Sequence, residues 1–174
     1  ANADALLYDS MAAFYTACSS FIAQNFGARK KKRILQTYLI CLFYSFITSL
    51  VLGVGIYLAR YPFLYLFTSD KAVVEAGITR LSIMALSYSA SAFMDASIAA
   101  SRGLGKTAVP TFVVVMGSCV FRIIWIYTIF AYFHTIQSLY ILYVFSWGIT
   151  AIAENIYFFH VYRHTLTGKT ESHF

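Results

Sequence analysis

The feature that most constrains this chain is an uncharged run of 26 residues at positions 34–59, bounded by Arg33 and Arg60. About 20 apolar residues are enough for a helix to cross the hydrocarbon core of a bilayer. Lipid offers no partner for backbone N–H and C=O groups, so a spanning segment of this length is a helix and not an isolated strand. The run therefore predicts a transmembrane helix over residues 34–59.

Four further apolar stretches predict four more spans, each interrupted by one or two charged residues. Only 11% of the 174 residues are charged and 60% are hydrophobic. A soluble domain carries about 25% charged residues, so the composition argues against an ordinary cytosolic enzyme. We expect an all-α, polytopic transmembrane helix bundle of about five spans that occupies residues 1–174. The predicted spans are 6–26, 34–59, 73–101, 107–133 and 137–162, followed by a cytoplasmic tail at 163–174.

The distribution of Lys and Arg predicts the orientation of these spans. If the first helix ends inside, the inner segments 27–33, 102–107 and 163–174 hold nine Lys and Arg residues, and the outer loops hold two. Cytoplasmic loops carry such an excess, so we expect a multi-pass protein of the cell membrane with its C-terminus in the cytoplasm. Five helices that begin outside without a signal peptide are typical of the C-terminal piece of a longer protein. The net charge of +6 is read as this topology signal, and no nucleic-acid partner is expected.

Polar residues inside the spans indicate where the function lies. In the third span, Ser87, Ser91 and Asp95 recur at i, i+4 and i+8 and share one face, with Arg102 seven residues further. Small residues crowd this span, which lets helix backbones approach closely. The first span carries a comparable stripe at Asp9, Thr16, Ser20 and Gln24. Since lipid penalises polar groups, both stripes are expected to face other helices or a water-filled cavity.

The carboxylate of Asp95 is the most expensive of these groups, at about 2.5–3.5 kcal/mol for a helix centre. A cationic partner reduces that cost, and so does protonation for part of the time; the second is what an ion-coupled transporter needs. Asp95 lies eight residues before Gly103, or about 12 Å from the inner helix end, and Glu154 lies at a similar depth. Arg122 lies about 22 Å from the same boundary, too far for a comfortable ion pair. Both a structural ion pair and a titrating carboxyl stay open from the residues alone.

Two other patterns are read as structural. Residues 103–107, GLGKT, end like a phosphate-binding loop, but Ala100 stands where that motif needs its first glycine. His160 and His164 have metal-ligand spacing without the glutamate of an HExxH motif, so no metal site is expected.

Several segments together resemble the multidrug and toxic compound extrusion (MATE) transporters. The matching pieces follow one another at the family's spacing over nearly the whole chain. They are SFIAQNFGA at 20–28 before the basic run, LF at 66–67 with Asp70, MD at 94–95, SRGLGK at 101–106 with Pro110, GSCVFRIIWI at 117–126 and SWGITA at 146–151.

This resemblance implies most of one six-helix lobe of a twelve-helix transporter, with the N-terminal lobe and the seventh helix missing. It implies multidrug or organic cation efflux by antiport with protons or sodium ions, no cofactor besides that coupling ion, and no enzyme activity. The implied partners are the lipid bilayer, a small organic cation or drug, and the missing N-terminal lobe; such a piece alone should not transport. Asp95 and then Glu154 are the candidate cation-binding groups. The candidate cavity or gate residues are Gln24, Asn25, Ser87, Ser91, Arg102, Gly103 and Arg122.

Two rival functions remain open at this point. A lipid-linked oligosaccharide flippase of the same superfamily would need more cationic residues facing the cavity, to hold an anionic pyrophosphate. A non-transporting membrane scaffold or assembly subunit would be supported by a start codon just upstream of Ala1, whereas an upstream reading frame that encodes seven more spans would exclude it. A membrane enzyme is the weakest alternative, because no catalytic spacing of serine, histidine and acid stands out.

Overall fold

Every element of the chain is helical in the computed structural model, which describes residues 2–66, 68–133 and 136–164. The predicted all-α class is confirmed. Of the predicted tail at 163–174, the residues after 164 lie outside the described part. The elements are α1 (Asn2–Gly27), α2 (Lys31–Leu58), α3 (Arg60–Tyr65), α4 (Lys71–Gly103), α5 (Ala108–Val115), η1 (Met116–Val120), α6 (Phe121–Trp125), η2 (Ile126–Phe130), α7 (Ala131–Phe133) and α8 (Ile136–His164), where η denotes a π-helix.

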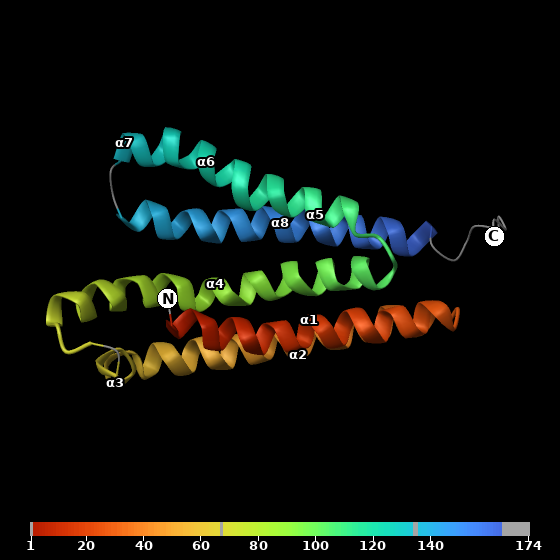
Figure 1. The fold of residues 1–174 in the computed structure, drawn as a ribbon, viewed down its shortest axis with the longest axis horizontal. Helices are drawn as coiled ribbons and strands as arrows, with labels where there is room; N and C mark the ends of the chain where they lie inside the picture. The colour runs from red at the N-terminus through yellow and green to blue at the C-terminus, as the bar shows by residue number, and fades with distance from the viewer. Residues whose placement is uncertain (1, 67, 134–135, 165–174) are drawn as a thin grey trace.

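Helix α4 is the centre of the bundle. It packs against α1 and α2 on one side and against α8 on the other, and the segments from α5 to α7 pair with α8 (Figure 1). The small residues Ala92, Ala99 and Ala100 of α4 are fully buried. Small side chains allow this close helix packing where no hydrophobic force drives association in lipid.

Three helical segments are long and apolar enough to cross a membrane: Lys31–Leu58, Ala108–Phe130 and Ser138–His164. Helix α4 adds a fourth if its two halves, Lys71–Ser82 and Ser87–Gly103, form one span; they are bent by 53° relative to each other. Helix α1 follows the bundle with 26 residues, about 39 Å, but is not among these segments. Polar residues such as Asp9 and Gln24 make α1 less apolar than α2 and α8.

The surface of α2 that faces away from the bundle is suited to hydrocarbon. Leu39, Phe43, Ile47 and Val51 of this helix are all exposed. An apolar surface of this extent marks a membrane or protein contact, because soluble proteins keep such patches small. Together with the long apolar segments, this surface makes the chain a multi-pass membrane protein.

The chain reverses at defined turns. Asp70 caps α4 by accepting a 2.9 Å hydrogen bond from the Ala72 N–H. At the other end of α4, Lys106 N–H donates to the Ser101 carbonyl at 3.0 Å and Gly105, with φ of +76°, donates to the Arg102 carbonyl at 2.9 Å. This is a Schellman C-cap with glycine in the left-handed conformation. Residues 103–107 therefore form the end of α4 and the turn after it, which agrees with the structural interpretation of this segment.

Candidate transport site

The polar stripe on α4 faces α1. Ser91 Oγ lies 3.8 Å from the Met11 sulfur of α1 and donates to the Tyr88 carbonyl at 3.0 Å. Ser87 and Ser91 are both buried, at 4% and 2% exposed. The serines are therefore packed between helices, as predicted, while Asp95 continues the same face toward a cavity.

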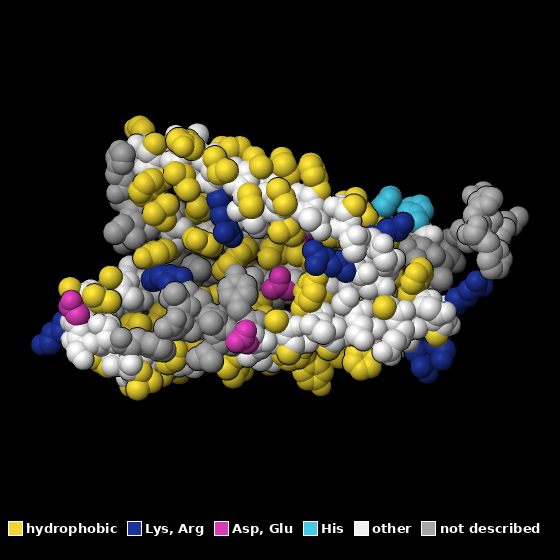
Figure 2. All heavy atoms as spheres, in the orientation of Figure 1, with side chains coloured by type: hydrophobic (Ala, Val, Ile, Leu, Met, Phe, Trp, Pro, Cys, Tyr) yellow, Lys and Arg dark blue, Asp and Glu magenta, His cyan; other side chains and the backbone are white. Residues whose placement is uncertain are grey.

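Asp95 lines a cavity of about 210 Å³ together with Met11, Ala12, Tyr15 and Thr16, which all belong to α1. Its carboxylate forms no hydrogen bond and no ion pair with any residue that the structure describes. Thr16 uses its own hydroxyl to bond the Ala12 carbonyl at 2.9 Å. Along the middle of the face in Figure 2, acidic and basic side chains lie over α4 amid hydrophobic ones. The cavity thus presents an unpaired carboxylate beside the Tyr15 ring.

Glu154 of α8 is the second carboxylate inside a span. It is 0% exposed, and neither carboxylate oxygen has a hydrogen-bond partner in the described part of the chain. The Arg102 guanidinium is close enough to attract it electrostatically, without forming an ion pair with it. A buried carboxylate without hydrogen bonds is unusual, because such groups are normally satisfied.

The Tyr38 hydroxyl links three helices and shows the relative depth of Asp95 and Glu154 in the bundle. The Tyr38 hydroxyl of α2 is hydrogen-bonded to Ser97 Oγ of α4 at 3.0 Å and to Asn155 Oδ1 of α8. Asp95 lies two residues before Ser97, and Glu154 lies one residue before Asn155. The two carboxyl groups therefore lie within about 3 Å of each other in depth, as the count of residues from the helix ends predicts.

Four of the residues predicted to line the cavity or gate lie at one end of the bundle: Gln24, Asn25, Arg102 and Gly103. A Cβ on Gly103 would lie 2.7 Å from the Ser19 carbonyl oxygen, so α1 and α4 touch here. Asn25 Nδ2 donates to the Phe21 carbonyl at 2.8 Å and to Thr37 Oγ1 at 3.4 Å, which ties α1 to α2.

Two longer side chains complete this end. Gln24 is exposed and donates to Ser20 Oγ at 3.5 Å within α1. Arg102 donates to Thr111 Oγ1 at 3.3 Å, and its guanidinium carbon lies 5.9 Å from the centre of the Tyr15 ring. Arg102 thus contacts Tyr15, which lines the Asp95 cavity, and its role as a gate residue stays a prediction.

Arg122 is held by α8 and not by an acid. Its Nε donates to Ser146 Oγ at 3.2 Å, and its guanidinium carbon lies 4.3 Å from the centre of the Tyr143 ring. Ser146 Oγ in turn donates to the Gly117 carbonyl at 2.8 Å. Among the described residues Arg122 has no carboxylate partner, and its guanidinium makes a cation–π contact with Tyr143 instead.

Sequence reasoning did not single out Tyr15, Tyr38 or Asn155. Tyr15 precedes Thr16 of the predicted polar stripe and faces Asp95. Asn155 follows Glu154 directly, so a polar pair inside an apolar span was visible. The pairing of Tyr38 with Asn155 carries no sequence signal, because it depends on how α2 and α8 lie beside α4.

The family model MatE matches residues 2–128. The match includes α1 to α6 and therefore contains Asp95, Arg102, Gly103 and Arg122, whereas Glu154 lies beyond it. No curated protein matches the chain in sequence. The family comprises membrane transporters, which agrees with the long apolar helices and with acids inside the spans. The chain belongs to the MatE family, the MATE superfamily of membrane transporters.

Proposed function

We propose that this chain forms part of an antiporter that exports organic cations or drugs across the cell membrane in exchange for protons or sodium ions. The observation that carries the proposal is the Asp95 carboxylate, which lines a cavity and has no partner among the described residues. In this proposal a second lobe completes the cavity, and the C-terminus lies in the cytoplasm.

The surroundings of Asp95 suit reversible binding of a cation. An aspartate at a helix centre costs about 2.5–3.5 kcal/mol, so a bound cation lowers its free energy. Tyr15, another residue of the cavity lining, carries an aromatic ring of the kind that organic cations prefer. A cavity of about 210 Å³ is smaller than an ordinary ligand pocket of about 300–1,000 Å³. The second lobe would supply the remaining wall and open the site to alternate sides by rocking.

Glu154 is the second candidate for the coupling step. Burial of an unpaired carboxylate is unfavourable, so the group must be neutral or find a partner in another state of the transporter. Its depth matches that of Asp95, which allows both acids to respond to one rearrangement of α4 and α8.

The proposal is tested by the isosteric variant Asp95→Asn in the complete two-lobe transporter. Efflux of a fluorescent organic cation from proteoliposomes is measured under an imposed proton or sodium gradient. The variant should lose gradient-driven efflux while it keeps its folded yield. Glu75→Gln is the matched control, because Glu75 is an exposed acid on the same helix. Unchanged gradient-driven efflux in Asp95→Asn would remove this residue from the mechanism.

One observation favours a second candidate, a lipid-linked oligosaccharide flippase. The Arg122 guanidinium sits inside a span without a carboxylate partner among the described residues, as a site for a pyrophosphate would require. Arg122→Gln separates the two functions. It should abolish translocation of a fluorescent pyrophosphate lipid if the flippase assignment is right, and should leave organic cation efflux largely intact if the antiporter assignment is right.

A further inference from the structure

We infer that the groove between α1 and α2, on the side of these helices away from α4, binds one anionic phospholipid. One acyl chain lies in the groove and the phosphate lies against Arg33. This groove has a volume of about 300 Å³. It is separate from the Asp95 cavity, and the inference does not depend on the transport function proposed above.

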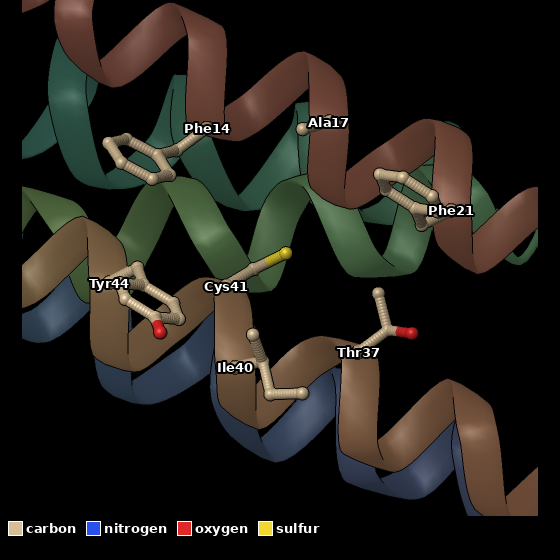
Figure 3. Close-up of a pocket in the computed structure, with 7 residues that line it drawn as sticks. All are labelled: Phe14, Ala17, Phe21, Thr37, Ile40, Cys41 and Tyr44. Atoms are coloured by element: carbon tan, nitrogen blue, oxygen red, sulfur yellow. The ribbon is translucent and has the colours of Figure 1, made fainter.

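The lining of the groove is apolar and runs along the helix axes. From α1 come Phe14, Ala17 and Phe21, and from α2 come Thr37, Ile40, Cys41 and Tyr44. Figure 3 shows the two sets on facing helices, with the ribbon of α4 behind them. On each helix the lining extends over eight residues from first to last, a rise of about 10 Å. A groove of this shape lies parallel to the acyl chains of a bilayer.

The groove is open on the side away from α4. Phe21, Ile40 and Tyr44 are 55–57% exposed. Thr37 already accepts a hydrogen bond from Asn25, so the lining has little polar capacity left for a hydrophilic ligand. A hydrocarbon chain is the occupant that this lining fits.

The end of the groove nearest the α1–α2 turn is basic. On α2, Arg33 lies four residues before Thr37 and seven before Ile40, so it continues the same face of the helix. Its side chain is exposed and has no hydrogen bond or ion pair with a described residue. Lys30 and Lys32 beside it are also exposed and form no hydrogen bond or ion pair with a described residue through their side chains. The Lys31 ammonium, in contrast, donates to the Arg163 carbonyl at 3.2 Å.

An apolar groove that ends in cations is complementary to an anionic phospholipid. Thr37 lies about 6 Å from Arg33 along the axis of α2. This distance is of the same order as the length of the glycerol–phosphate part of a phospholipid. Lys and Arg at the membrane surface attract anionic headgroups, each by a factor of about five in affinity. A zwitterionic lipid would fill the same groove without this gain.

The test uses the 174-residue chain purified in neutral detergent, with dioleoyl phosphatidylglycerol and dioleoyl phosphatidylcholine as probes. Bound lipid is counted by native mass spectrometry, and the thermal unfolding midpoint is followed. Phosphatidylglycerol should bind more tightly and raise the midpoint more than phosphatidylcholine, and inorganic phosphate should do neither. Equal binding of the two lipids, or an equal effect of phosphate, would overturn the inference.

Four variants test the basic end and the apolar lining of the groove separately. Arg33→Gln should weaken phosphatidylglycerol about fivefold and leave phosphatidylcholine unchanged, and Arg33→Lys should restore most of the loss. Lys106→Gln is the matched control, since it removes an exposed charge at the same end of the bundle but away from the groove. Ala17→Phe should fill the groove and weaken both lipids. If Lys106→Gln acts as strongly as Arg33→Gln, or if Ala17→Phe retains full binding, the lipid is held by general charge and not by this groove.

Discussion

Replacing Gly103 by alanine should force α1 and α4 apart at the end of the bundle where α4 turns into α5. A Cβ at this position would lie 2.7 Å from the Ser19 carbonyl oxygen and 2.9 Å from Cβ and Cγ2 of Ile22. The carbonyl belongs to the α1 backbone, so the conflict cannot be relieved by a rotation of a side chain. Overpacking costs about 1–3 kcal/mol, and the better helix propensity of alanine returns about 0.5–1 kcal/mol.

The net loss of about 1–2 kcal/mol should lower the thermal unfolding midpoint by about 2–8 °C. Far-ultraviolet circular dichroism in neutral detergent measures this shift. Gly148→Ala is the matched control, because no atom lies within 4 Å of a Cβ at that helical position. The control should unfold at or slightly above the midpoint of the unaltered chain. A Gly103→Ala midpoint equal to that of the control would refute the close contact between α1 and α4.

Two other substitutions follow from the same geometry. Gly117→Ala should destabilise the pairing of η1 with α8, because its Cβ would overlap with Thr150 Oγ1. The double variant with Thr150→Ala should regain most of the lost stability in a thermal unfolding cycle, and additive losses would contradict the contact. Arg29→Gly should raise the unfolding free energy by about 1 kcal/mol in neutral detergent, because Arg29 has a φ of +56° in the turn that follows α1. A chemical denaturation series would show no gain if that strain is absent.

The helical fold follows from the sequence because lipid leaves a chain few choices. The uncharged residues 34–59 predict a span, and α2 covers Lys31–Leu58. The predicted span at 107–133 and the helical path from Ala108 to Phe133 agree within one residue. The two π-helical segments on either side of Arg122 could not be predicted from the sequence. Residues 116–130 carry no charge other than Arg122 and contain no proline that would mark a change in the helix.

The candidate site was predicted in its parts and not in its contacts. The serine spacing before Asp95 defines one face of α4, and that face does meet α1. Which residues complete the cavity depends on the rotation of α1, so Tyr15 and Met11 could not be read from periodicity. Arg122 was equally out of reach, since its partners Ser146 and Tyr143 lie on a helix whose register no local pattern sets.

In the proposed mechanism, the Asp95 carboxylate exchanges a coupling ion for an organic cation. This exchange is tested most directly by measuring how many ions are released when one substrate molecule binds. Calorimetric titration of the complete transporter with a fluorescent organic cation, in buffers of different ionisation enthalpy and at several sodium concentrations, gives that release. We expect the unaltered protein to release about one proton, or to show sodium competition at one site. Asp95→Asn should show neither effect. Equal ion release in the unaltered protein and in Asp95→Asn would contradict the assignment of Asp95 as the exchanging group.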